Sequence, residues 1–117
     1  MRTILMAALA AGLSTAATAE DLFIVCDNGL RCVRMPCPHR DVVALPSGTR
    51  YPRNEPKFEN IPRTEIERLM RDGALYEGTV VLGGTIDRGP PASIVARRVV
   101  RPATPAETAV CRPRPGR

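Results

Sequence analysis

After residue 20, the sequence contains short runs of apolar, β-forming residues that are separated by turn signals. The run LFIV at 22–25 precedes the turn signal Asp-Asn-Gly at 27–29, in which Asn and Gly tolerate positive φ. A second run, DVVAL at 41–45, ends at the turn residues PSG at 46–48. The pattern predicts a strand that enters a hairpin at 27–29, followed by a further strand.

One segment has the spacing of an amphipathic helix. Its apolar residues recur three and four positions apart, which places them on a single face (Ile66, Leu69, Met70). Thr64 and Glu67 have the T-x-x-E spacing of a capping box, and Gly73 fits a left-handed C-terminal cap. We therefore predict a short helix that ends at Gly73, after an irregular proline-containing loop at 49–62.

The pattern after the helix predicts a hairpin. A long β segment at 75–87 and another at 93–100 are joined by the turn RGPPA at 88–92. Three glycines inside the first segment predict a bulge or bend that curls the sheet (Gly78, Gly83, Gly84). The element order βββαββ is that of the oligonucleotide- and oligosaccharide-binding (OB) barrel. The predicted fold is therefore α+β, with a small antiparallel, partly closed sheet of OB-like order, one helix and disulfide staples.

Residues 1–19 have the features of a signal peptide that is cut after Ala19. Arg2 precedes a short apolar run, and small residues precede the cut. The run is shorter than the roughly twenty residues that a bilayer span requires, so we expect no membrane span. The predicted location is periplasmic or secreted. Cleavage leaves a small α+β domain at 20–103 and a Pro/Arg-rich tail at 104–117.

Arginine accounts for most of the positive charge, and the formal net charge of the chain is +5 at pH 7. In the last part of the sequence, only Glu107 opposes a group of arginines (Arg97, Arg98, Arg101, Arg112, Arg114, Arg117). Arg112 and Arg114 are therefore candidate binding residues for an envelope protein or an anionic surface such as acidic lipid or polysaccharide. Because export removes the chain from intracellular DNA and RNA, we expect no nucleic-acid partner.

Four cysteines follow the predicted cut, and in an exported chain an even number indicates disulfides. Three pairings are open. We predict Cys32–Cys37, which closes a proline-containing turn, and Cys26–Cys111, which ties the tail to the first strand. A domain of this size gains from such crosslinks because its core is small.

The stretch CVRMPCPHRD at 32–41 admits three interpretations. The first is a disulfide-clamped turn, in which Arg34 and Met35 are candidate binding residues. The second is a copper site with soft ligands, although an oxidising compartment consumes the thiols it needs (Cys32, Met35, Cys37, His39). The third is a rigid loop that offers the Arg34–Met35 bond to a trypsin-like protease. Residues 32–39 resemble part of the antistasin-type inhibitor repeat, which carries the third interpretation. We predict the clamped turn, without a metal ion or other cofactor.

The sequence contains little that indicates a catalytic site. His39 is the only histidine, and no G-x-S-x-G turn accompanies it. The stretch Cys32 to Cys37 and the segments 78–87 and 93–100 resemble small exported bacterial proteins that have a C-x4-C stretch and a glycine-containing hairpin. That resemblance implies location and build, and no activity. The predicted protein is a non-enzymatic binding or structural module.

Overall fold

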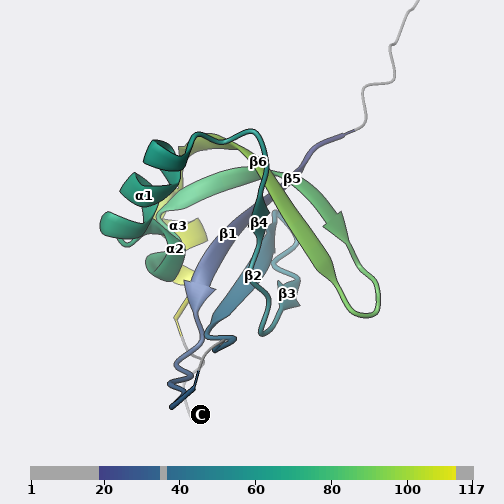
Figure 1. Cartoon of the computed structure of the whole chain (residues 1–117). Helices are drawn as coiled ribbons and strands as arrows, with labels where there is room; N and C mark the ends of the chain where they lie inside the picture. The colour runs from purple at the N-terminus through teal and green to yellow at the C-terminus, as the bar shows by residue number, and fades with distance from the viewer. Residues whose placement is uncertain (1–18, 35–36, 113–117) are drawn as a thin grey trace, which may run out of the picture.

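One six-stranded sheet organises residues 19–34 and 37–112, the part of the chain that the computed structural model describes (Figure 1). Its strands are β1 (Asp21–Asp27), β2 (Arg40–Leu45), β3 (Arg50–Tyr51), β4 (Lys57–Phe58), β5 (Val80–Asp87) and β6 (Ser93–Pro102). The helices are α1 (Arg63–Arg71), α2 (Ala74–Glu77) and α3 (Pro105–Ala109). The predicted α+β class with two disulfides is confirmed.

The strand order across the sheet is β3-β2-β1-β5-β6-β4. All neighbouring strands are antiparallel except β4 and β6, which are parallel, so the sheet is mixed. The sheet is open, with the two-residue strands β3 and β4 at its edges, rather than partly closed. Both edge strands come from the segment that the sequence pattern presents as an irregular loop, because two residues are too few to show a period.

The hairpin predicted at 27–29 is only partly confirmed, because β1 does pair with the next strand but its connection is not a turn at these residues. β1 and β2 pair in antiparallel register from Leu22 opposite Leu45 to Asp27 opposite Arg40. Their connection is therefore the whole segment 28–39 and not a tight turn. We call residues 28–39 the cysteine loop.

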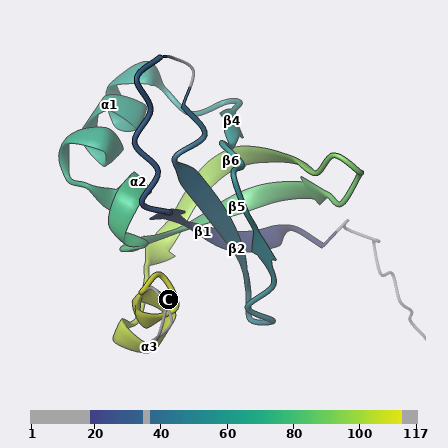
Figure 2. The same cartoon turned by 90° about the horizontal axis from the view of Figure 1, so that it is seen from below.

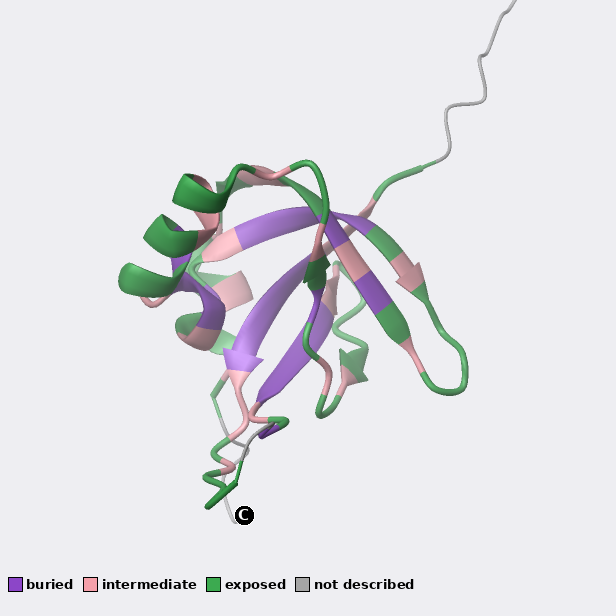
Figure 3. Cartoon of the chain, in the orientation of Figure 1, coloured by how far each residue is buried: buried purple, intermediate pink, exposed green. Residues whose placement is uncertain are grey.

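Alternating residues of β1 face two hydrophobic clusters, one on each side of the sheet. Phe23 and Val25 belong to the larger cluster, which includes residues of α1 and α2 such as Leu69 and Leu75. Ile24 and Cys26 belong to a smaller cluster, against which Cys111 and Ala103 pack from the C-terminal region. Figure 3 shows the buried centre of the sheet and the exposed outer surface of α1. The sheet is thus covered on both faces.

The predicted capping box at Thr64 and Glu67 is wrong. Helix α1 begins at Arg63 after Pro62 in the N-cap position, and no side chain of the described residues caps it. Because proline fixes φ and lacks an N–H, it suits the start of a helix, and here it places Thr64 inside the first turn.

The predicted apolar stripe of α1 is only partly confirmed. Leu69 is buried and Ile66 is half-buried, but Met70 is 46% exposed. The helix thus packs through a narrower face than its spacing suggests. Gly73, directly after the C-cap Asp72, has φ 76° and ends the helix in the predicted left-handed conformation.

The glycine-containing strand β5 shows the predicted irregularity. Its register against β6 shifts between Gly83 and Gly84. A Cβ on Gly84 would overlap the carbonyl oxygen of Val95, so only glycine permits this close approach. Gly78 lies outside the strand, where it ends α2 with φ 65°. The turn at 88–92 joins β5 to β6 as predicted.

Residues 104–112, the described part of the predicted tail, pack against the domain. Helix α3 carries the capping box that α1 lacks: the Thr104 side chain accepts from the Glu107 amide at 3.2 Å, and the Glu107 carboxylate accepts from the Thr104 amide at 2.9 Å. The Thr108 hydroxyl donates to the Gly78 carbonyl at 2.9 Å. The same T-x-x-E signal is thus present in the sequence at both places and forms a cap only at the second.

The predicted signal peptide at 1–19 lies outside the described residues, apart from Ala19. Residues 113–117 lie outside them as well. Among the helices of the described residues, none is long and apolar enough to cross a membrane.

Candidate functional site

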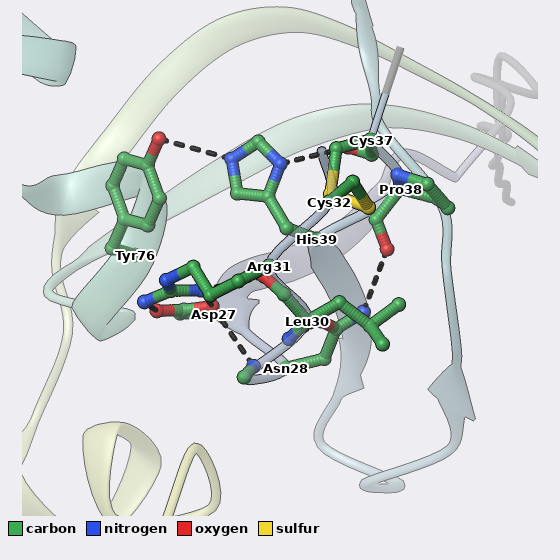
Figure 4. The surroundings of a disulfide bond; sticks show 10 residues. Asp27, Asn28, Leu30, Arg31, Cys32, Cys37, Pro38, His39 and Tyr76 are labelled. Carbon is green, nitrogen blue, oxygen red and sulfur yellow. Dashed lines mark hydrogen bonds and ion pairs between the residues drawn. A yellow bond between two sulfur atoms is a disulfide. The ribbon is translucent and has the colours of Figure 1, made fainter. Parts of the chain in front are cut away.

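The cysteine loop projects from one end of β1 and β2 and is closed on itself by a disulfide (Figures 1 and 4). Cys32 and Cys37 are bonded, with their Cα atoms 5.5 Å apart. The second disulfide joins Cys26 to Cys111 across 85 positions of sequence. Both pairings are those predicted.

Asn28 holds the two halves of the loop together at its base. Its backbone amide donates to the His39 carbonyl at 2.9 Å, and its side-chain amide donates to the Pro38 carbonyl at 2.9 Å. The same amide group also donates to Asp41 at 3.0 Å, while its oxygen accepts from the Leu30 backbone at 2.9 Å. One side chain thus fixes the base of the loop relative to the first residues of β2.

The first half of the loop, which follows β1, is held by an ion pair. Arg31 donates to both carboxylate oxygens of Asp27, at 3.1 and 2.8 Å, and the Gly29 amide donates to the same group at 2.9 Å. The hydrogen bond from Arg31 lowers the pKa of Asp27; burial opposes this effect without cancelling it. Because Arg31 is mostly exposed, the pair orients the loop more than it stabilises the fold.

The second half of the loop, which leads into β2, is anchored to helix α2 through His39 (Figure 4). Its Nδ1 lies 2.8 Å from the Cys37 carbonyl, which only accepts, so Nδ1 carries the proton. Its Nε2 lies 3.0 Å from the Tyr76 hydroxyl, and Arg40 donates to that hydroxyl at 3.1 Å. Arg40, Tyr76, His39 and Cys37 are therefore linked by a continuous series of hydrogen bonds. Both ring nitrogens of the only histidine are engaged in holding the loop.

Arg40 connects this series of hydrogen bonds to a second segment of the protein, the one that contains Glu55. Its guanidinium donates to Glu55 at 3.0 Å and lies 4.7 Å from the centre of the Tyr76 ring. Arg40 is 6% exposed, and its Nε has no hydrogen-bond partner among the described residues. A buried arginine with two directional partners fixes its neighbours, so the first residue of β2 is a rigid support for the loop.

Asp41, the next residue, is a buried carboxylate with three donors. Besides Asn28, it accepts from the Arg50 guanidinium at 2.7 Å and from the Arg53 amide at 2.9 Å. Burial raises the pKa of Asp41, but the donations from Arg53, Asn28 and Arg50 together lower it more, and the net direction is downward. The support of the loop thus joins it to β3 and to the segment that follows β3.

The tip of the loop presents an apolar side chain to solvent. Val33 is fully exposed, at 103% of its reference area, and the adjacent Arg34 is also exposed. Met35, the other residue predicted here, lies outside the described residues. Sequence reasoning missed Val33, although a valine inside a ring closed by nearby cysteines has no core within reach.

The copper interpretation needs thiolates that this arrangement does not offer. The sulfurs of Cys32 and Cys37 are bonded to each other. His39 is engaged with Cys37 and Tyr76, and Met35 lies outside the described residues. Within the described residues, no group of three or more His, Cys, Asp or Glu side chains is placed to hold a metal ion.

The protease-inhibitor interpretation needs an extended chain on both sides of Arg34. Five residue steps of extended chain span about 16 Å, at roughly 3.3 Å per residue. The Cα atoms of Cys32 and Cys37 are only 5.5 Å apart, so the chain does not run fully extended from one cysteine to the other. A strand extended over all six residues is therefore incompatible with the closed disulfide. The inhibitor interpretation stays a prediction.

Several of the arginines grouped near the end of the sequence are paired with carboxylates. Three that lie in β6 form ion pairs with glutamates (Arg97 with Glu59, Arg98 with Glu20, Arg101 with Glu107). The hydrogen bond from Arg101, followed by that from the Thr104 amide, lowers the pKa of Glu107 to about 2. Arg112 is exposed and forms no ion pair with any described residue, whereas Arg114 lies outside them. Two of the three glutamates come from distant segments, which only the fold brings to β6.

A polar crevice of about 140 Å³ lies at the opposite end of β1 and β2. It runs between the β2–β3 turn and the β5–β6 hairpin (Asp21, Leu22, Ala44, Leu45, Ser47, Thr49, Tyr51, Ile86, Arg88). None of the binding residues predicted from the sequence lines it. The predicted binding residues that the structure describes lie instead in the cysteine loop and after α3.

The fold and the site together define a small, disulfide-stapled α+β protein that presents a closed loop on a rigid support. Comparison of the chain with protein families, with curated proteins and with solved structures found no match.

Proposed function

We propose that the protein is an exported, non-enzymatic binding module that contacts a protein partner through the tip of the cysteine loop. The observation that carries this proposal is the full exposure of Val33 on a ring whose base is held by hydrogen bonds. Burying an apolar side chain of this size in a partner's pocket is worth about 1.5 kcal/mol or more. Because the ring is already closed, little ordering entropy is lost on binding.

The chemistry of the tip supports one kind of partner. Val33 suits a small apolar pocket, and the adjacent Arg34 suits a carboxylate at the rim of that pocket. A lipid or polysaccharide surface offers negative charge without such a pocket. The tip therefore favours a folded protein over an anionic surface.

The proposed location is the periplasm or the extracellular space. Two disulfides are consistent with an oxidising compartment, and the sequence of residues 1–19 supports export. An envelope protein is the proposed class of partner.

The first experiment captures a partner and then measures its affinity. The chain from residue 20 onwards is immobilised, envelope proteins that bind are identified, and the purified partner is titrated against variants. We expect Val33→Asp to weaken binding at least about tenfold, because it places a charge in the partner's pocket. Arg34→Gln should weaken binding several-fold and reduce its dependence on salt.

The matched control is Val110→Asp, which makes the same change at an exposed valine after α3. This variant should bind normally. Normal binding by Val33→Asp, with loss of binding when Arg112→Gln and Arg114→Gln are combined, would move the binding surface to the tail. Inhibition of a trypsin-like protease by the unmodified chain, abolished by Arg34→Ala, would restore the inhibitor interpretation instead.

A further inference from the structure

The two disulfides differ in their access to solvent. Cys26 is fully buried between the strands of the smaller cluster, and Cys111 is half-buried against it. Cys32 is exposed, whereas its partner Cys37 is 9% exposed. A reagent that attacks sulfur thus meets an exposed cysteine at one disulfide, and only a buried and a half-buried cysteine at the other.

We propose that Cys32–Cys37 is a thiol–disulfide exchange site that a dithiol, either a small molecule or a protein with paired cysteines, opens and closes in the folded protein. A thiolate of the dithiol attacks Sγ of Cys32, the Cys32–Cys37 bond breaks, and Cys37 leaves as a thiolate that takes up a proton. The second thiol of the reductant then attacks the mixed disulfide and releases the Cys32 thiol. Two electrons and two protons pass to the protein, and the reductant becomes a disulfide.

The geometry assigns different roles to the two cysteines. Cys32 is the sulfur open to attack because its residue is exposed. Cys37 is the leaving sulfur, and its backbone carbonyl remains fixed by two hydrogen bonds of 2.8 Å from His39. After reduction, Cys37 therefore stays near its position, and reclosure needs only the return of Cys32.

The opening is confined to the ring. The bonds at the base of the loop join residues that lie outside the ring, such as Asn28 to Pro38 and Arg31 to Asp27. They do not depend on the disulfide, so the sheet and its second disulfide remain intact when the ring opens. Reduction removes the closed shape at Val33, although the exchange itself does not depend on the binding function proposed above.

The test is stepwise reduction of the chain from residue 20 onwards in a series of dithiothreitol concentrations, without denaturant. Free thiols are trapped with N-ethylmaleimide and located by peptide mass spectrometry, and circular dichroism follows the sheet. We expect Cys32 and Cys37 to be labelled at least about tenfold faster than Cys26 and Cys111, with an unchanged sheet signal. Equal labelling rates, or loss of the sheet signal together with the first labelling, would overturn the proposal.

A matched pair of variants tests which sulfur is attacked. Cys37→Ser leaves Cys32 as a free thiol, and Cys32→Ser leaves Cys37. With glutathione disulfide as the probe, Cys32 should form the mixed disulfide at least about tenfold faster than Cys37. Faster reaction at Cys37 would contradict the assignment of Cys32. The labelling experiment on the unmodified chain decides the proposal even where a variant fails to fold.

Discussion

At the residue scale, a few polar side chains decide the shape of the candidate site. Asp41 is the clearest case, because it is buried and accepts from three different segments of the chain. Its neighbour Arg40 is buried as well and supports the other half of the loop. Two adjacent charged residues at the start of β2 thus hold the cysteine loop without belonging to it.

The lowered pKa of Asp41 predicts a dependence of stability on pH. Because the pKa in the folded state lies below the ordinary value of 3.8, the charged carboxylate stabilises the fold above about pH 4, and this stabilisation is lost as the pH falls further. Asp41→Asn should lower the free energy of unfolding by about 1–3 kcal/mol at pH 7 and flatten its decrease below pH 4. Urea unfolding between pH 2 and 7 measures both effects.

The control for this prediction is Asp72→Asn, which changes an exposed carboxylate at the end of α1. It should leave the stability within about 0.5 kcal/mol of the unmodified protein. An Asp41→Asn variant with the same pH profile as the unmodified protein would show that this carboxylate does not support the loop in solution.

At the scale of elements, the same sequence signal has different outcomes in two helices. The T-x-x-E spacing occurs at the start of both α1 and α3, but Pro62 sets the first residue of α1 and removes Thr64 from the cap position. In α3 the box forms with both of its hydrogen bonds, between Thr104 and Glu107. A capping box therefore needs the right backbone frame as well as the right residues.

This contrast gives a paired prediction. Thr104→Ala should lower the free energy of unfolding by about 1 kcal/mol, because it removes a side-chain cap. Thr64→Ala should change it by less than about 0.5 kcal/mol, because Thr64 is an exposed residue inside the first turn. Urea unfolding of the two variants measures the difference. Equal losses, or a larger loss for Thr64→Ala, would contradict the assignment of the caps.

At the scale of the whole molecule, Cys26–Cys111 joins the C-terminal region to the face of the sheet opposite α1 and α2 (Figure 2). Arg50 reinforces this attachment by donating to the Val110 carbonyl at 2.7 Å. The small core of β1 and its neighbours is thereby closed on its second side. The region predicted as a tail therefore contributes, up to residue 112, to the packing of the domain.

The two disulfides should differ in their contribution to stability. Crosslinking across 85 positions restricts the unfolded chain by about 4–5 kcal/mol, whereas the five-position ring restricts it by only about 2 kcal/mol. Replacing Cys26 and Cys111 with alanine should therefore lower the urea midpoint more than the same change at Cys32 and Cys37. A larger effect at the ring would mean that the cysteine loop is part of the cooperative fold.

Residues that are close together along the chain were enough to predict much of the fold of this protein. Apolar runs and turn residues placed β1, β2 and β6, and the glycines at 83 and 84 indicated the irregular register. The β segment predicted at 75–87 contains β5, but its first residues belong to helix α2 instead. The number and placement of cysteines indicated both disulfides. These features depend on neighbours along the chain or on covalent chemistry, and both can be read in order from the residues.

The remaining features depend on contacts between distant segments, so only the tertiary structure decided them. The two-residue strands β3 and β4 exist because the sheet edges offer them partners, and α3 lies where Cys111 and Thr108 attach it. The glutamates that pair with β6 and the donors that surround Asp41 come from separate parts of the sequence. By itself, the sequence determined the class and the main strands, and it indicated disulfides without excluding the other two pairings. The fold decided which charges are neutralised and which side chain, Val33, remains fully in water, because burial and pairing require a completed surface.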